Sequence, residues 1–184
     1  IIDHCSDVLL PYTERSRMNL LAEGISGQRI YVIGNPIYEV LQHFAARIEQ
    51  ATILNDLGLA PGKYFLVTMH RAENVDVEAR LRGLTSALEA LHAEYGVPII
   101  CSLHPRTRDR MLRFGIKTGQ GAIQFYEPFG FFDFVALEKH ALCLLSDSGT
   151  VQEEGCILRV ANVTLRDVTE RPETLENGSN MLTG

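Results

Sequence analysis

The sequence has no excess of basic residues, and this absence limits the partners that it can bind. Its 17 Lys and Arg stand against 23 Asp and Glu, which gives a formal net charge of -6 and a pI near 5.5. A protein that holds nucleic acid by its phosphates needs a surplus of positive charge. We therefore expect no nucleic-acid partner. A small phosphorylated ligand is compatible with this charge, since it needs only a few well-placed groups.

Long apolar runs are missing as well. No run approaches the roughly 20 apolar residues that are needed to cross a bilayer. The chain also does not open with a basic segment followed by an apolar stretch and a cleavage site. We therefore expect no membrane partner and a cytoplasmic location.

The common motifs of catalytic and cofactor sites are absent too. The sequence contains no P-loop, no G-x-S-x-G elbow, no G-x-G-x-x-G turn and no zinc-type cluster of His and Cys. Its four cysteines are widely spaced without a C-x-x-C pair, a pattern typical of buried free thiols in a cytosolic protein; they are Cys5, Cys101, Cys143 and Cys156. We expect neither a metal nor a cofactor.

What the sequence does contain is a set of short apolar runs that alternate with segments of helical period. Continuous apolar runs predict strands that are buried on both faces of a parallel sheet. We predict strands at residues 7–10, 30–33, 64–69, 98–103, 123–125, 142–146 and 160–165. The clearest helix covers residues 77–95, where four leucines recur every three or four positions. The predicted fold class is α/β with a doubly wound, Rossmann-like parallel sheet.

A break in this pattern near residues 34–56 predicts a domain boundary. Gly34-Asn35-Pro36 ends a strand, and a polar helix over about residues 38–50 leads to a new unit at Leu57. We predict that residues 1–34 are the last strand and helix of another Rossmann-like domain, residues 35–56 a linker helix, and residues 57–184 a second domain that is truncated at its end. Since a lone βα unit cannot bury its apolar face, we expect the chain to be a fragment.

Polar segments follow four of the predicted strands, at the sheet edge where open α/β proteins bind ligands. They are residues 70–74, 104–107, 146–154 and 166–173. The third segment opens a helix, so the amides of Ser148, Gly149 and Thr150 would point from a helix N-terminus at a ligand. Phosphate suits that position because of the helix dipole and the unpaired N–H groups. Glu154, about one turn further on, could accept from both hydroxyls of a ribose.

Each of these segments also has a plainer explanation. Residues 150–153 read T-x-x-E, a capping box that needs no ligand but leaves Glu154 unexplained. A histidine after a strand, such as His70, is more often a local hydrogen-bonding group than a diphosphate contact or a proton carrier. Arg106 and Arg171 are each as typical of a surface position as of a ligand contact. The convergence of four polar strand ends favours a nucleotide site over these separate explanations.

In this order, the segments resemble the non-hydrolysing UDP-N-acetylglucosamine 2-epimerases, two-domain enzymes with the architecture of the GT-B glycosyltransferases. The pieces that carry the resemblance are V-T-M-H-R-A-E-N at 67–74, H-P at 104–105, S-D-S-G-T-V-Q-E-E at 146–154 and L-R-D-V-T-E-R-P-E at 165–173. The resemblance covers essentially the whole chain. It implies an isomerase that interconverts UDP-N-acetylglucosamine and UDP-N-acetylmannosamine for polysaccharide biosynthesis, by eliminating UDP and adding it back.

The resemblance also implies which part of such an enzyme this is and which residues act. The chain would be the C-terminal, UDP-binding domain with a remnant of the catalytic domain, inactive alone and monomeric, from a homodimeric parent. The family's UDP contacts fall on His70, Phe134, Ser148, Gly149, Thr150, Glu154 and Arg171. In these roles, residues 148–150 hold phosphate, Glu154 the ribose, and Arg171 and His70 the diphosphate, with His70 as a catalytic residue. Arg71 and His104 are the implied contacts of a second, activating UDP-N-acetylglucosamine.

Two departures from the family pattern and three other functions remain open. Thr150 stands where a glycine is usual, and Phe129 stands where a glutamine helps to hold uracil. A UDP-sugar-dependent GT-B glycosyltransferase, a hydrolysing UDP-N-acetylglucosamine 2-epimerase and a regulatory binding module would use a similar nucleotide site. The T-E-R-P-E segment beside S-D-S-G favours the epimerase over the transferase.

Overall fold

The computed structural model of this chain describes residues 1–117, 121 and 123–183. It splits into two compact units, Ile1–Ala45 and Ala46–Gly184. Gly184, the end of the domain predicted over residues 57–184, lies outside the described residues. The predicted limits at residues 34 and 56 stay a prediction.

The first unit has little regular structure beyond its helices. These are α1 (Ile2–Cys5), α2 (Glu14–Ala22), the 3-10 turn η1 (Gly27–Arg29) and α3 (Pro36–His43). Thr13 caps α2, since its side chain accepts a hydrogen bond from an amide of the first turn. The strands predicted at residues 7–10 and 30–33 are wrong in extent, because they meet only in one parallel bridge between Leu9 and Ile30. An isolated pair of strands has little stability without further strands beside it.

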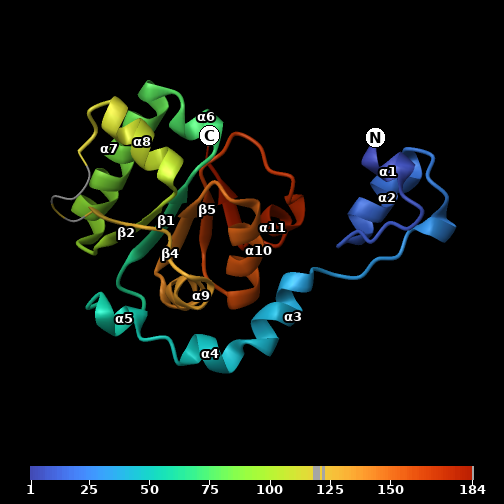
Figure 1. The fold of residues 1–184 in the computed structure, drawn as a ribbon, viewed down its shortest axis with the longest axis horizontal. Helices are drawn as coiled ribbons and strands as arrows, with labels where there is room; N and C mark the ends of the chain where they lie inside the picture. The colour runs from blue at the N-terminus through green and yellow to red at the C-terminus, as the bar shows by residue number, and fades with distance from the viewer. Residues whose placement is uncertain (118–120, 122, 184) are drawn as a thin grey trace. The chain divides into compact units, whose positions relative to one another are not determined.

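The second unit is built on a six-stranded sheet in the order β3-β2-β1-β4-β5-β6, with every neighbouring pair parallel (Figure 1). The strands are β1 (Phe65–Met69), β2 (Ile99–Leu103), β3 (Ile123–Tyr126), β4 (Cys143–Ser146), β5 (Asn162–Thr164) and β6 (Asn180–Leu182). This is the doubly wound, Rossmann-like order, so the predicted fold class is confirmed. Five strands form within two residues of their predicted ends, whereas β6, only three residues long, was not predicted.

Helices cover both faces of this sheet, and each face has its own apolar core. On one side α6 (Ala72–Val75), α7 (Glu78–Tyr95) and α8 (Pro105–Arg113) pack around a cluster that includes Val67, Leu81 and Met111. On the other, α5 (Ile53–Asp56), α9 (Phe131–His140) and α10 (Gly149–Leu158) pack around Leu66 and Leu137. Because successive strand residues face opposite sides, this double cover explains the continuous apolar runs.

One of the two remaining helices precedes the sheet in the chain, and the other lies between β5 and β6. They are α4 (Ala45–Glu49) and α11 (Pro172–Glu176). The polar helix predicted over residues 38–50 is interrupted at Phe44, where α3 has ended and α4 has not begun. In the described part of the chain, no helix combines the length and the apolar character needed to span a membrane.

The prediction that the cysteines are buried holds for only one of the four. All four are free thiols, but Cys5 is exposed and Cys143 and Cys156 are half-buried. Cys101, in the middle of β2, is buried. Burial raises the pKa of the Cys143 thiol to about 11, so this thiol stays protonated at neutral pH. Cys143 is the first residue of β4, and the three residues that follow it in the strand are buried.

Helix α10 packs very closely on the sheet. A Cβ atom added to Gly155 would lie 3.1 Å from Leu144 Cδ1 and 3.3 Å from the backbone oxygen of Val160. Any other residue type at this position would require these neighbours to move by a few tenths of an ångström. Gly155 therefore allows the close approach of α10 to β4.

Replacing this glycine tests how strongly the packing constrains α10. Gly155→Ala should lower the free energy of unfolding, because the new methyl group meets a backbone oxygen that cannot move easily. Gly83→Ala is the matched control: Gly83 lies inside α7 with nothing near its added Cβ, and alanine should there raise stability by up to about 1 kcal/mol. Urea denaturation of both variants measures the difference. Equal gains at the two positions would contradict the close packing.

Candidate functional site

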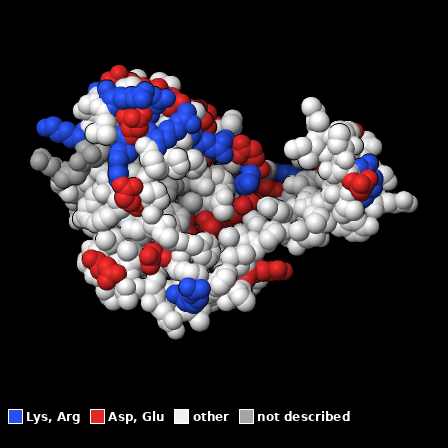
Figure 2. All heavy atoms as spheres, in the orientation of Figure 1, with Lys and Arg blue, Asp and Glu red and all other residues white. Residues whose placement is uncertain are grey.

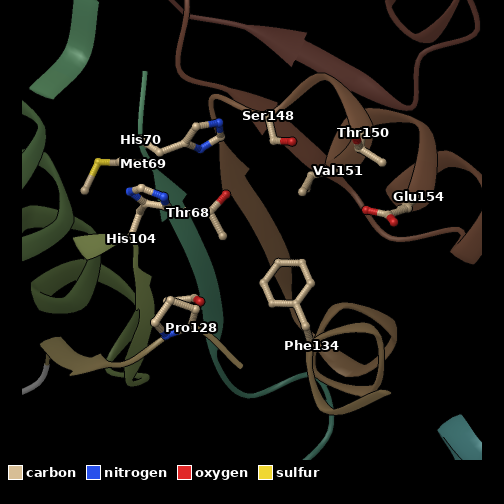
Figure 3. Close-up of a pocket in the computed structure, with 11 residues that line it drawn as sticks. Thr68, Met69, His70, His104, Pro128, Phe134, Ser148, Thr150, Val151 and Glu154 are labelled. Carbon is tan, nitrogen blue, oxygen red and sulfur yellow. The ribbon is translucent and has the colours of Figure 1, made fainter. Parts of the chain in front are cut away.

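The carboxyl ends of β1 and β4 lie side by side where the strand order reverses, the position at which open α/β sheets bind ligands. A cavity of about 360 Å³ opens there. It is lined by Thr68, Met69, His70, Ser102, His104, Pro128, Phe134, Ser148, Thr150, Val151 and Glu154. Figure 3 shows the two histidines on one side of this space, α10 on the other and the ring of Phe134 at its base. Six of the nine predicted site residues therefore line one cavity.

The first turn of α10 has no side-chain cap. Its N-cap residue, Ser148, makes no side-chain hydrogen bond to the amides that follow. The capping box predicted over residues 150–153 is therefore wrong, because the helix has already begun at Gly149 and Thr150 lies inside it. The side chain of Glu153 is turned to Arg171 instead. The amide of Ser148 donates to Ser146 Oγ at 3.0 Å, whereas the amides from Gly149 onward are left for an anion, which the helix dipole also favours.

Arg171 lies directly against this helix end. A Cβ atom on Gly149 would be 3.3 Å from Arg171 Cζ, so the missing side chain of Gly149 makes room for the guanidinium group. Arg171 Nε donates to Glu153 Oε1 at 3.1 Å, which balances part of its charge. Arg171 is itself the N-cap of α11, with Pro172 in the first turn as predicted. Two helix N-termini and one guanidinium group converge here, an arrangement that attracts a multiply charged anion.

The loop that carries Arg171 is held in place by two buried polar groups that the sequence reasoning did not select. Arg166 is almost fully buried and donates from both Nη atoms to Glu170, at 2.8 and 2.9 Å, which lowers the pKa of Glu170 to about 2. Gln152, fully buried in α10, accepts from the hydroxyl of Thr169 at 2.7 Å. The same hydroxyl accepts from the amide of Arg171 at 3.1 Å. The position of Arg171 therefore depends on Gln152.

The end of β4 is joined to the end of β1 through Asp147, whose side chain is fully buried. Its carboxylate accepts from the amide of His70 at 3.0 Å, the amide of Arg71 at 2.9 Å and the side-chain amide of Asn74 at 3.0 Å. His70 Nδ1 lies 3.1 Å from the same group. Sequence reasoning quoted Asp147 only as part of a motif. A signal was present, since an acid that directly follows a buried strand must find donors at that edge.

These contacts control the charge of both partners. Burial would raise the pKa of Asp147, but hydrogen bonds from His70, Arg71 and Asn74 outweigh it and lower the pKa below its usual range. The hydrogen bond to Asp147 raises the pKa of His70 against the opposing effect of burial. The imidazole is therefore held in one orientation and biased toward its protonated form.

The two residues of the implied activator site lie differently. His104 lines the cavity and caps α8, with Nδ1 accepting from the amide of Arg106 at 3.2 Å. Its ring centroid is 6.4 Å from that of His70. Arg71 does not line the cavity, and its Nε donates to the backbone oxygen of Asp147 at 3.2 Å. The activator role of this pair stays a prediction.

A cluster of arginines on α8 gives a second basic surface, visible in Figure 2. These arginines are paired with carboxylates: Arg106 and Arg110 with Asp76, Arg108 with Glu127, and Arg113 with Asp109. The surface is therefore typical of a solvated, ion-paired helix rather than of an anion site. Among the residues that the structure describes, no group of His, Cys, Asp and Glu is arranged to hold a metal ion.

Comparison with known proteins places this site in a family. A family model for UDP-N-acetylglucosamine 2-epimerases matches residues 1–184. The chain belongs to this family. It is 42% identical over 190 residues to the UDP-N-acetylglucosamine 2-epimerase of Methanocaldococcus jannaschii, a match that covers 100% of this chain and 52% of the relative. The chain spans about half the length of the curated relatives that it matches.

A solved structure of the same relative shows how similar the fold is, and one further relative acts on a different sugar nucleotide. A crystal structure of the M. jannaschii epimerase in complex with UDP-GlcNAc and UDP has a TM-score of 0.92 and 42% identity to this chain, over 99% of this chain and 51% of that one. A UDP-2,3-diacetamido-2,3-dideoxy-D-glucuronate 2-epimerase of Pseudomonas aeruginosa is 33% identical over 185 residues, which covers 100% of this chain and 50% of the relative. Family membership alone therefore does not determine the sugar.

Removing the charge of Asp147 tests its role at this edge. Asp147→Asn should cost about 3–5 kcal/mol of unfolding free energy, because buried donors lose their acceptor, and it should lower the pKa of His70, measured by NMR titration. In the wild type the contribution of Asp147, whose pKa is lowered, is present above about pH 3.8 and is lost as the pH falls through its folded pKa. The exposed ion pair of Asp167 with Arg80 supplies the control. Asp167→Asn should cost less than about 1 kcal/mol, and equal costs would contradict the role of Asp147.

Proposed function

We propose that this chain provides the UDP-binding half of an enzyme that interconverts UDP-N-acetylglucosamine and UDP-N-acetylmannosamine. The observation that carries the proposal is the uncapped first turn of α10 with the guanidinium group of Arg171 against it, beside Glu154 and His70 in one cavity. Family membership and the UDP-GlcNAc and UDP bound in the M. jannaschii relative support it.

The proposed contacts divide the nucleotide among distinct groups. The amides of Gly149 and Thr150 and the guanidinium group of Arg171 hold the diphosphate, since both are positive and adjacent, and the hydroxyl of Ser148 adds a further donor. Thr150 serves as well as glycine here because the backbone N–H makes the contact. Glu154 accepts from the ribose hydroxyls. Phe134 forms an apolar wall of the cavity.

The proposed reaction makes UDP a leaving group and then a nucleophile. As a base removes the proton from C2 of the sugar, the electron pair forms a C1–C2 double bond and the bond from C1 to the diphosphate oxygen breaks, giving UDP and 2-acetamidoglucal. UDP then adds back to C1 while a proton returns to the opposite face of C2. Arg171 and His70 stabilise the charge that grows on the diphosphate. The family resemblance assigns the remaining acid and base groups to the part of the whole protein outside this chain.

Isotope labelling distinguishes this reaction from those of the other candidate enzymes. With the whole protein and UDP-N-acetylglucosamine in deuterated water, NMR should show deuterium at C2 of UDP-N-acetylmannosamine and no free sugar. A hydrolysing relative would release N-acetylmannosamine and UDP, and a glycosyltransferase would need an acceptor and leave the hydrogen on C2. Either of these patterns would overturn the proposal. An unchanged substrate, the result expected of a regulatory module, would overturn it as well.

Calorimetric titration of this chain separates the proposed contacts. Arg171→Ala should weaken UDP binding about tenfold or more and leave uridine binding unchanged, since a hydrogen bond to a charged group contributes about 1.5–3 kcal/mol. Glu154→Ala should weaken both ligands, because both carry the ribose. Arg113→Ala, an exposed arginine that pairs with Asp109 on α8, is the control and should change neither. If the folded chain does not bind UDP, or if Arg171→Ala has no effect, the proposed site is wrong.

The other implied properties are proposals without a structural test in this chain. They are the activator site, the dimeric parent, the cytoplasmic location and the role in polysaccharide biosynthesis.

A further inference from the structure

Helix α9 carries a carboxyl group that the proposed reaction leaves unused. The side chain of Glu138 is fully buried. Neither of its oxygens accepts a hydrogen bond from any donor in the described part of the chain, and no cation pairs with it there. Glutamate is almost never fully buried without a partner, because removing its charge from water is costly. A group held against that cost requires an explanation.

The group that faces Glu138 is the carboxyl of Glu154. Helices α9 and α10 pack against each other, and the two carboxyls lie close enough for each to shift the pKa of the other. Glu154 is only 6% exposed and lines the cavity. On α9, Glu138 follows Phe134 by four residues and so lies on the same side of the helix, one turn on. Since Phe134 also lines the cavity, Glu138 sits immediately behind the proposed ribose contact.

The two carboxyls cannot both be ionised in this environment. Burial, together with the neighbouring Glu154, raises the pKa of Glu138 well above its ordinary value. Burial also raises the pKa of Glu154, helped by the charge of Glu153, but the hydrogen bond from Glu138 opposes that rise. Because its pKa is raised further, Glu138 keeps its proton to a higher pH than Glu154, which takes the first negative charge of the pair, as in other pairs of carboxyls with unequal surroundings.

We propose that Glu138 is a positioning residue for ribose recognition: its carboxylic acid O–H donates to the carboxylate of Glu154 and holds it ready to accept from both ribose hydroxyls. One lone pair of Glu154 is then used by Glu138, and the others face the cavity. The inference rests on the proposed function, which assigns the ribose to Glu154. Its consequence is specificity, because an oriented acceptor discriminates against a sugar that lacks one hydroxyl.

A packing role does not explain why a glutamate occupies position 138. Its helix neighbours Val135, Ala136 and Leu137 are all buried, and Leu137 packs into the apolar cluster on this face of the sheet. An apolar side chain of similar size would fit this position without any desolvation cost. Residues that break a packing rule in this way are expected at functional sites.

Binding of UDP and 2′-deoxy-UDP to this chain and two variants tests the inference. The wild-type chain should prefer UDP about tenfold or more. Glu138→Gln keeps a neutral N–H donor and should keep that ratio within about threefold. Glu138→Leu removes the donor and should lower the ratio more than about threefold. If Glu138 had only a packing role, Glu138→Leu would weaken the binding of both ligands equally.

Stability gives a second measurement that distinguishes the two roles. Glu138→Leu should raise the melting temperature at pH 7, since the cost of burying this carboxyl exceeds the contribution of its one hydrogen bond to Glu154. Because the folded pKa of Glu138 is raised, its cost to folding develops above the unfolded value of about 4.5 and is absent below it. The gain from Glu138→Leu should therefore shrink below that pH. A loss of stability at pH 7 would overturn the inference.

The outcomes separate this inference from the proposed function. If the wild-type chain binds UDP and its 2′-deoxy analogue equally, Glu154 does not contact the ribose and that part of the proposed function fails together with the inference. If the wild type discriminates and Glu138→Leu keeps the full ratio, only the inference fails. Infrared spectroscopy tests the inference even if Glu138→Leu does not fold. The wild-type chain at neutral pH should show the band of a protonated carboxyl group, and this band should be absent in Glu138→Gln. Without that band, the inference is wrong.

Discussion

The buried carboxylate of Asp147 is the contact on which the geometry of the site depends. It comes from the residue after β4, yet its donors belong to the turn after β1 and to α6. It therefore connects the two strands between which the chain reverses direction across the sheet. The same group orients the ring of His70 and biases its charge. An ionised carboxylate is stable in this buried place only because several donors converge on it.

Two buried carboxyls near this sheet edge have opposite pKa shifts for a physical reason. Asp147 is surrounded by N–H donors that lower its pKa, whereas burial and the neighbouring carboxyl of Glu154 raise the pKa of Glu138. One group acts as an acceptor that joins strands, and the other acts as an acid that can donate. The separation follows from the hydrogen-bond partners rather than from depth, since the structure buries both completely.

The phosphate end of the cavity is also built from backbone that other parts of the fold hold in place. Gly155 allows the close approach of α10 to β4, and Gln152 holds the loop that carries Arg171. These residues contact no part of the proposed ligand. They explain how an uncapped helix end and a guanidinium group, each unfavourable alone, are kept adjacent until an anion binds. The 0.92 TM-score to the M. jannaschii relative shows that this backbone arrangement is shared at 42% identity.

The sequence by itself determined five of the six strands of the second unit, the helix over residues 78–95 and most of the cavity lining, because these follow from local pattern. Strands buried on both faces are continuous apolar runs, and parallel strands bring the residues after them to one edge. Only the tertiary structure decided that Asp147, Gln152 and Glu138 matter, since their partners are distant in sequence or, for Glu138, on another helix. It also placed the start of α10 at Gly149 and reduced the two strands of the first unit to one bridge. A side chain's partners depend on how elements pack, and local periodicity carries no record of that.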